Sequence, residues 1–251
     1  MENFKEKAFS YMAFGKIFGH LFLVMEPKIF YHKLLEKNGK QEKADKFGFP
    51  AVKKWSKFVI NAAKVNIEVE GLEKIPTDQP VLFTPNHQSY ADVPILLHAL
   101  KDFNFGFLMR MQLNQFFAIK QISHILHCVP INQENAREGI KALHKTAEQI
   151  KEGLSMVVFP EGKRGFSNTP DEFKNGAFKI VQKTGVTVVP IYIRNAFKIL
   201  EGSGGIVTPT DVKVTILDPI ETSEMNRAQV KELNERVYNV ILAESQKYEE
   251  E

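Results

Sequence analysis

The sequence of 251 residues has one cysteine, Cys128, and a net charge of only +3. One cysteine cannot form an intrachain disulfide, and no stretch combines the basic, apolar and small-residue parts of a secretory signal peptide. Both absences favour a reducing, cytosolic setting. The nearly balanced charge does not by itself indicate a polyanionic partner, and the length fits one large domain with a small appendage.

Several common catalytic motifs are also missing. Ser89 does not lie in a G-x-S-x-G turn, which argues against a serine hydrolase. The stretch "FPEGKRG" lacks the earlier glycine and the following hydroxyl of a nucleotide-binding P-loop. His124, His127 and Cys128 are close in sequence but have no further ligand pair, so an ordinary helix-to-strand segment is favoured over a metal site. We therefore expect no metal and no cofactor.

No long apolar run is free of polar residues. The stretch "AFSYMAFGKIFGHLFLVM", residues 8–25, has about the length of a membrane span but carries Lys16 and His20 in its middle. A charge at the bilayer centre costs roughly 3 kcal/mol on insertion scales, so a simple span is disfavoured. A helix in the membrane interface, with Lys16 reaching the headgroups, fits better. A helix docked on the protein's own core is the alternative.

A basic segment follows directly. Residues 28–64 contain ten lysines, three acidic residues and several interleaved aromatics. Such a segment suits an anionic membrane surface or nucleic acid. Because it adjoins the apolar stretch, we expect residues 1–64 to form an amphipathic helical membrane-binding region, peripheral or monotopic on the cytoplasmic face of the cell membrane. Nucleic acid is not expected as a partner, and salt-sensitive binding to DNA would reveal it.

The pattern changes to that of an α/β domain over residues 65–251. Seven short apolar or alternating stretches, from "NIEVEG" and "PVLFTP" to "DVKVTILDPI", predict strands. Helices are expected over residues 92–100, 134–152 and 171–183, and Ser223 is expected to cap a last one. The apolar stripe of residues 134–152, which includes Ile140, is expected to be core. The alternation predicts a central mixed or mostly parallel sheet flanked by helices.

In such sheets, reactive groups gather beyond the carboxyl ends of the strands. The stretch "PNHQSYADVP" follows one strand and places His87 and Asp92 five residues apart. Five residues turn a helix by about 500°, so the two side chains meet only if the chain turns between them. A carboxylate on one ring nitrogen would fix the tautomer and leave the other nitrogen free to take a proton. For this pair alone, a helix-capping Asp92 beside a core histidine stays an open alternative.

A second polar stretch, "FPEGKRG", follows another strand and contains Glu161, Lys163 and Arg164 within four residues. Gly162 frees the backbone to turn, and the two cations suit the oxygens of a phosphate. A solvated turn in which Glu161 pairs with Lys163 is the alternative.

Together "NHQSYAD", "FPEGKRG", "EFKNGAF" and "VVPIYI" resemble, in order and spacing, the four-motif signature of the glycerolipid acyltransferases, which share an H-x-x-x-x-D motif. The bacterial members that act on 1-acyl-sn-glycerol-3-phosphate are the most similar. The resemblance implies transfer of a fatty acyl group from a thioester of acyl carrier protein or coenzyme A to the free hydroxyl of a lysophospholipid. A relative that acts on another lysolipid, or that binds lipid without catalysis, is the alternative.

The resemblance also implies roles for individual residues. His87 would be the general base on the acceptor hydroxyl, and Asp92 would orient His87 and stabilise its charged form. Glu161 would hold the glycerol portion, and Arg164 would bind the phosphate.

Three positions depart from the family pattern. In "PINQEN", Gln133 stands where the family usually has an arginine, so one phosphate contact is missing. Lys163 stands in place of threonine, and Arg110 in place of a lysine. Either Lys163 compensates for the missing arginine, or the acceptor depends less on a phosphate. With Gly162, these three residues complete the expected substrate-binding set.

Overall fold

The structure is a computed structural model that describes residues 2–248. Its centre is a seven-stranded sheet in the order β1-β7-β6-β2-β5-β3-β4, in which β6 and β7 are antiparallel and all other neighbours are parallel. The expected mostly parallel sheet is confirmed. The strands are β1 (Asn66–Glu70), β2 (Val81–Pro85), β3 (Phe105–Arg110), β4 (Val129–Ile131), β5 (Ser155–Val157), β6 (Thr187–Arg194) and β7 (Asp211–Ile216).

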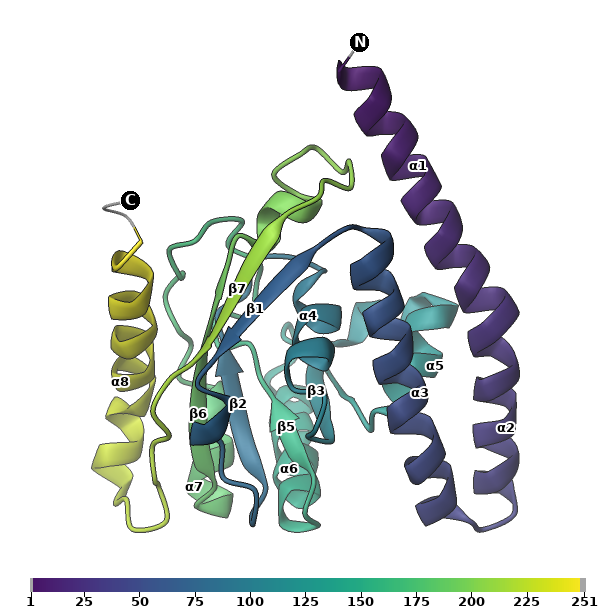
Figure 1. The fold of residues 1–251 in the computed structure, drawn as a ribbon. Coiled ribbons are helices and arrows are strands. Elements are labelled where there is room, and N and C mark those ends of the chain that lie inside the picture. The colour runs from purple at the N-terminus through teal and green to yellow at the C-terminus, as the bar shows by residue number, and fades with distance from the viewer. Residues whose placement is uncertain (1, 249–251) are drawn as a thin grey trace.

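Helices cover both faces of the sheet (Figure 1). Helices α3, α4 and α5 contribute to the core on one face, and α6, α7 and α8 to the core on the other. The helices are α1 (Glu2–His20), α2 (Glu26–Lys37), α3 (Gln41–Ala62), α4 (Asp92–Ala99), α5 (Phe117–Ile125), α6 (Ala136–Lys151), α7 (Val181–Thr184) and α8 (Arg227–Gln246).

Strand β2 shows why the central strands are continuous apolar runs. Leu82 packs into the core under α6 to α8, whereas Val81 and Phe83 pack into the core under α3 to α5. Successive side chains of a strand point to opposite faces, so a strand covered on both sides must be apolar throughout. Such a buried frame holds the loops at its carboxyl end in place.

The N-terminal segment forms one long helical rod on the outside of the molecule (Figure 1). A single π-helical segment, Leu21–Met25, joins α1 to α2. Met25 and Ile29 are buried against the protein, while Phe22, Leu23 and Phe30 are 59%, 80% and 70% exposed. One face of the rod thus packs on the core of the protein, and another face exposes apolar side chains. By length and composition alone, the helix over Phe4–Lys37 could cross a membrane.

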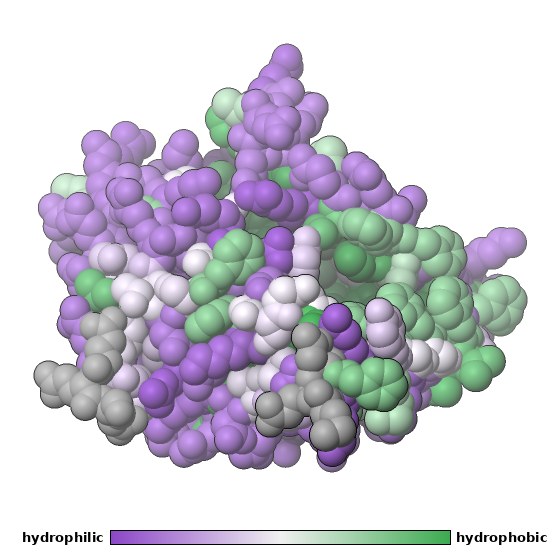
Figure 2. Space-filling view, turned by 90° about the horizontal axis from the view of Figure 1, so that it is seen from above, coloured by the Kyte–Doolittle hydropathy of each residue, from purple (hydrophilic) through white to green (hydrophobic). Residues whose placement is uncertain are grey.

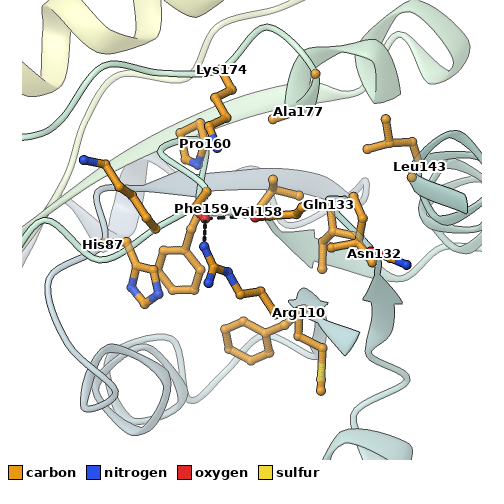
Figure 3. A pocket seen from close by; sticks show the side chains of 18 of the residues that line it. His87, Arg110, Asn132, Gln133, Leu143, Val158, Phe159, Pro160, Lys174 and Ala177 are labelled. Atoms are coloured by element: carbon orange, nitrogen blue, oxygen red, sulfur yellow. Dashed lines mark hydrogen bonds between the residues drawn. The ribbon is translucent and has the colours of Figure 1, made fainter. Parts of the chain in front are cut away.

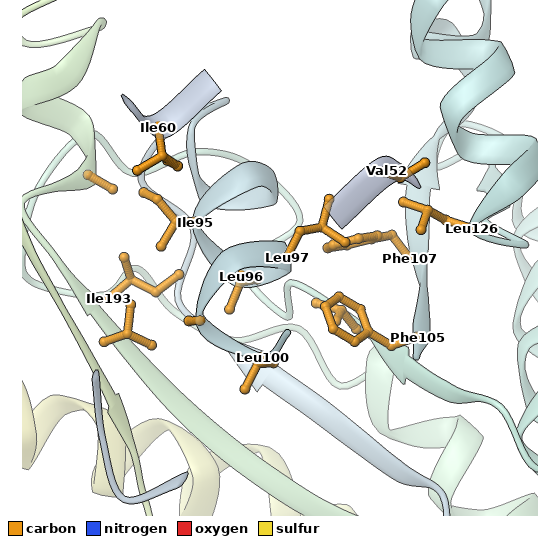
Figure 4. Close-up of a cluster of buried hydrophobic side chains, with 14 of the residues drawn as sticks. Val52, Ile60, Ile95, Leu96, Leu97, Leu100, Phe105, Phe107, Leu126 and Ile193 are labelled. Atoms are coloured by element: carbon orange, nitrogen blue, oxygen red, sulfur yellow. The ribbon is translucent and has the colours of Figure 1, made fainter. Parts of the chain in front are cut away.

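Helix α3 ties this rod to the sheet. Val52 and Ile60 of α3 pack beside Ile95 and Leu97 of α4 and Phe107 of β3 (Figure 4). The expected boundary between residues 64 and 65 falls in the turn before β1. The division into a membrane-associating region and an α/β domain stays a prediction.

The helix expected over residues 171–183 is wrong in its first half. Helical structure begins only at Ala177, with a short 3₁₀ turn before α7. Upstream, the Asp171 N–H donates to the Glu161 carboxylate, and the Lys174 N–H donates to the Pro160 carbonyl at 2.9 Å. These tertiary hydrogen bonds override the local preference for a helix.

The cap expected at Ser223 is also wrong, because α8 begins after Asn226. The Asn226 side chain accepts N–H bonds from Ala228 and Gln229, and the Gln229 side chain accepts the Asn226 N–H in return. This reciprocal capping box satisfies the free donors of the first turn better than an isolated serine would.

Candidate active site

The site lies at one edge of the sheet, where four neighbouring parallel strands end. His87 follows β2, residues 161–164 follow β5, Arg110 ends β3 and Gln133 follows β4. Because β2, β5, β3 and β4 are adjacent and parallel, their carboxyl ends meet at this edge. A cavity of about 630 Å³ opens there, and the side chains that line it come from all four segments (Figure 3).

His87 and Asp92 contact each other, which decides between the two alternatives left open by the sequence. His87 Nδ1 lies 2.7 Å from Asp92 Oδ2, across the turn that leads into α4. The same carboxylate oxygen accepts the N–H groups of Gln88 and Ser89 at 2.7 and 2.9 Å. An ionised carboxylate must be the acceptor on Nδ1, so the ring carries its proton there and leaves Nε2 free.

Asp92 is completely buried at the start of α4. Burying a carboxylate is costly unless hydrogen bonds and local charge stabilise it. Here two N–H groups, the imidazole and the N-terminal end of the helix dipole do so. The pairing alternative is therefore the one observed: Asp92 binds His87 and the N–H groups of the preceding turn, while the N-cap of α4 is Ala91, without a side-chain cap.

The His87 ring is fixed on its face as well as at its edge. It stacks on Phe159 with 4.0 Å between ring centroids and an angle of 22° between planes (Figure 3). The side chain is 19% exposed and lines the cavity. A free ring nitrogen at a cavity wall can accept a proton from a bound molecule.

Glu161 connects the loop after β2 to the loop after β5 through hydrogen bonds. Its carboxylate accepts the His87 N–H at 2.7 Å and the Asp171 N–H at 3.2 Å, while the Gly165 N–H donates to the His87 carbonyl at 2.8 Å. Burial raises the pKa of Glu161 to about 8, although the two N–H bonds act in the opposite direction. Glu161 is 1% exposed and is not among the residues that line the cavity. The structure thus places Glu161 beneath the two loops, and its expected contact with the glycerol portion stays a prediction.

Arg110 and Gln133 converge on the turn at Gly162. Arg110 Nη2 and Gln133 Nε2 donate to the Gly162 carbonyl at 2.8 and 3.3 Å (Figure 3). Gly162 has a φ of +68°, a left-handed conformation that favours glycine. The turn therefore presents its carbonyl to two donors that also line the cavity.

Lys163 and Arg164 differ in how firmly they are held. Lys163 is 61% exposed and forms an ion pair of 2.9 Å with Asp171, which raises the pKa of the lysine. The Arg164 guanidinium donates to Glu201 at 2.8 Å and lies 3.7 Å from the centre of the Tyr90 ring. Arg164 is thus fixed in place, whereas Lys163 is turned toward solvent and neutralised.

His124, His127 and Cys128 do not form a common site. His124 contacts Glu36, His127 contacts Asp45, and burial raises the pKa of the Cys128 thiol to about 12. The expected helix-to-strand segment is confirmed, since α5 ends at Ile125 and β4 begins at Val129.

A model of the Acyltransferase family matches residues 66–194. This is slightly more than half of the chain and includes every predicted site residue. The chain belongs to the Acyltransferase family.

Relatives of this Acyltransferase-family chain carry consistent names. The chain is 36% identical to "1-acyl-sn-glycerol-3-phosphate acyltransferase LPAT1, chloroplastic" of Arabidopsis thaliana, covering 63% of this chain and 44% of the relative. It is 31% identical to "Probable 1-acyl-sn-glycerol-3-phosphate acyltransferase" of Mycoplasma pneumoniae, covering 51% and 49%. The chain spans about half the length of these relatives.

The fold of the whole chain is also known. It matches the crystal structure of the 1-acyl-sn-glycerophosphate (LPA) acyltransferase PlsC from Thermotoga maritima with a TM-score of 0.85. The match covers 99% of this chain and 98% of that one, at 23% sequence identity, and so shows the fold alone. The N-terminal rod and the α/β part are both included.

Sequence reasoning missed two charged residues of this Acyltransferase site. Lys174, in "EFKNGAF", lines the cavity, and its Nζ would lie 3.0 Å from a Cβ on Gly162. Glu201 accepts from the Ser89 hydroxyl at 2.6 Å and from the Tyr90 N–H at 3.0 Å in addition to Arg164. A motif signal pointed to Lys174, but Glu201 lies outside every quoted motif and only the fold brings it here.

Ile140 also differs from its expected place. It is 49% exposed and lines the cavity, whereas Leu143, Ala147 and Ile150 of the same helix are buried as expected. One turn of α6 therefore reaches beyond the edge of the core to the site.

Proposed function

We propose that this protein transfers a fatty acyl group from a thioester of acyl carrier protein or coenzyme A to the free hydroxyl of 1-acyl-sn-glycerol-3-phosphate. The observation that carries this proposal is the His87–Asp92 pair. The His87 ring has a free Nε2 and lines a cavity whose wall contains both cationic and apolar side chains. The names of the relatives support the choice of acceptor.

In the proposed reaction, His87 Nε2 takes the proton of the acceptor hydroxyl as its oxygen bonds to the thioester carbonyl carbon. The carbon–sulfur bond then breaks, and the imidazolium returns the proton to the leaving thiolate. Buried Asp92 stabilises the imidazolium between these steps. A positioned base contributes typically 10²- to 10⁴-fold, so orientation of the two substrates in the cavity supplies much of the remainder.

Cationic side chains in the wall suit a phosphate monoester. Arg110, Arg164 and Lys174 all line the cavity. A Cβ on Gly162 would lie 3.0 Å from Lys174 Nζ and 3.4 Å from Gln133 Nε2, so the lysine stands beside the position that lacks the family's arginine. We infer that Lys174, more than the solvent-facing Lys163, replaces the missing positive charge.

An apolar branch of the cavity suits an acyl chain. It is formed by side chains at the ends of β3 and β4, after β5 and on α6, namely Leu108, Ile131, Val158, Ile140 and Leu143. Apolar area buried by a chain stabilises binding by about 25 cal/mol per Å². One cavity can therefore hold the charged head and the apolar tail of a lysophospholipid.

The exposed side of the N-terminal rod suits the surface of a membrane. Figure 2 shows hydrophobic side chains gathered on one side of the molecule, beside a hollow. The basic segment of residues 28–64 adds attraction to anionic lipids. We propose that the protein docks there on the cytoplasmic face of the membrane as a peripheral or monotopic protein.

A thioester-consumption assay tests the acceptor. The wild type is compared on 1-acyl-sn-glycerol-3-phosphate and on a lysolipid without a phosphomonoester, with palmitoyl thioesters of both carriers. Lys174→Ala should lower kcat/KM on the phosphate acceptor at least tenfold, which is about 1.4 kcal/mol, and Lys163→Ala should have a smaller effect.

Gln133→Arg sharpens the test. If a phosphate binds here, the added cation should leave kcat/KM unchanged or raise it. A wild-type preference for the acceptor without a phosphate, together with a loss of activity in Gln133→Arg, would show another lysolipid to be the substrate. No turnover with either acceptor but retained vesicle binding would indicate a catalytically silent relative.

A further inference from the structure

Three side chains of types that can bind a metal meet outside the candidate active site, between α2 and α5. His32 and Glu36 lie one turn apart on α2, so both face the same side of the helix. His124 of α5 completes this histidine–glutamate cluster. His124 Nε2 lies 2.9 Å from Glu36 Oε2, His32 Nδ1 lies 3.5 Å from the same oxygen, and the ligand atoms are all within 4.8 Å of one another.

His32 is an unusual member of the cluster. Its side chain is completely buried, and neither ring nitrogen has a hydrogen-bond partner among the residues that the structure describes. A buried polar atom without a partner costs about 1–3 kcal/mol, so most native proteins avoid one. Burial also lowers the pKa of His32.

Helix α3 holds the His32 ring in this position. A Cβ on Gly48 would lie 2.6 Å from a ring carbon of His32, so only glycine allows the α3 backbone to pack directly on the ring. Figure 1 shows α2, α3 and α5 beside one another. The ring is held with Nε2 close to α3 and with Nδ1 3.5 Å from the Glu36 carboxylate.

We propose that His32, Glu36 and His124 bind one Zn²⁺ ion, with the fourth coordination position open to water. In a tetrahedral zinc site with ligand distances of 2.0–2.2 Å, neighbouring ligand atoms are about 3.3–3.6 Å apart. The 3.5 Å distance lies in this range, and the 2.9 Å distance requires Glu36 and the exposed His124 to move slightly apart. Imidazole and carboxylate are ordinary zinc ligands, and a partner for His32 would remove the cost of its burial.

Two of the three side chains are reachable from solvent. The His124 and Glu36 side chains are 56% and 19% exposed, so an ion can enter from solvent. The ion would join α2 to α5, which packs into the core through Ile122 and Ile125. Zinc would thus fasten the N-terminal rod to the α/β part, and this role is independent of the proposed acyl transfer.

Zinc titration of the metal-free protein tests the site by calorimetry, with metal content measured after dialysis. His124→Ala is the main variant because this side chain is largely exposed and its loss leaves the fold intact. Glu36→Gln removes the ligand charge and keeps the shape. His144→Ala, an exposed histidine on α6, and His127→Asn, next to the cluster but outside it, are controls for adventitious binding.

The wild type and both controls should bind one equivalent of Zn²⁺, and excess Mg²⁺ should not compete because imidazole does not suit hard cations. His124→Ala and Glu36→Gln should bind at least 100-fold more weakly. Zinc at 100 times its Kd should raise the wild-type Tm by about 5–10 °C. Amide hydrogen exchange in α2 should slow with zinc in the wild type only.

Absence of stoichiometric binding to the wild type would overturn the proposal. So would equal affinity in His124→Ala and the wild type, which would show that other surface groups hold the ion. These outcomes concern binding and stability, so they remain distinct from any result on acyl transfer.

Discussion

At the scale of single residues, the chemistry depends on how His87 is held. Nδ1 of its ring binds Asp92, and one face of the ring lies on Phe159. The backbone N–H of His87 donates to Glu161. Each contact removes a degree of freedom from the side chain, so Nε2 keeps one direction. Pre-organisation of this kind is what a general base needs, because a misplaced group loses rate steeply.

Changing His87 to alanine should abolish turnover and leave the fold intact. The imidazole is the only titrating group that the geometry offers as a base in this pair, and its removal opens only a small space at the cavity wall. Asp92→Asn should also lose activity, because an amide cannot stabilise an imidazolium. Steady-state kinetics together with circular dichroism checks both. Near-normal activity in His87→Ala would remove the proposed mechanism.

Glu161 predicts a pH dependence of stability. Its pKa of about 8 in the folded state lies above the ordinary value of 4.5, so the folded protein binds the proton more tightly than the unfolded chain. The contribution of this group to stability is therefore complete below pH 4.5 and is lost as the pH rises to 8. Urea unfolding of the wild type and Glu161→Gln across this range should show a steeper decline in the wild type. Parallel curves would mean that Glu161 is ionised throughout.

At the scale of elements, the N-terminal rod combines a buried face and an exposed face. Deleting residues 1–46 would remove buried side chains such as Met25 and Ile29 along with the exposed ones. Substitutions on the exposed face alone separate membrane binding from folding.

The double variant Leu23→Glu, Phe30→Glu should bind anionic vesicles at least about 100-fold more weakly. Burying each side chain in the interface contributes roughly 1.5–3 kcal/mol, and carboxylates oppose anionic lipids. Both residues are exposed, so the free energy of unfolding should change little. Val240→Glu, on α8 at the other side of the molecule, is the matched control (Figure 1). Vesicle co-sedimentation gives the affinities, and equal losses in both proteins would place the membrane contact elsewhere.

Helix α6 limits the apolar branch of the cavity through Ile140. Ile140→Trp should fill part of that branch and lower kcat/KM for long-chain substrates at least tenfold more than for octanoyl ones. The side chain is half exposed, so the helix tolerates the larger ring. Assays over acyl chains of several lengths measure the effect, and Ile140→Leu, of equal volume, serves as the control. An unchanged chain-length profile would mean that the chain binds along another wall.

At the scale of the whole molecule, the rod, α3 and the sheet share one core. Residues from α1 to α5 and from five strands belong to the same cluster of buried side chains. Figure 4 shows the part of this cluster around α4 and β3. We therefore expect one cooperative unfolding transition. The single tryptophan, Trp55, lies on α3 and packs against this cluster, so its fluorescence and the far-ultraviolet circular dichroism should change at the same denaturant concentration. Two separate midpoints would show that residues 1–64 unfold as a unit of their own.

Local patterns in the sequence were sufficient for the seven strands and most helices, and they made the His87–Asp92 contact one of two alternatives. Alternation, apolar runs and turn residues act over a few neighbours, so they can be read without knowing the fold. The same reasoning failed where distant contacts compete with local preference. Residues 171–176 stay outside any helix because hydrogen bonds to the loop at residues 160–161 outweigh helix formation.

Only the tertiary structure decided which segments meet. The strand order places β2, β5, β3 and β4 side by side, and this order alone brings residues 87, 110, 133 and 162–164 to one cavity. The packing of loops and helices also places Glu161 beneath the loops, Lys174 and Glu201 at the site, and His32 close to His124. Contacts between segments far apart in the chain depend on how whole elements pack, and no short stretch of sequence carries that information.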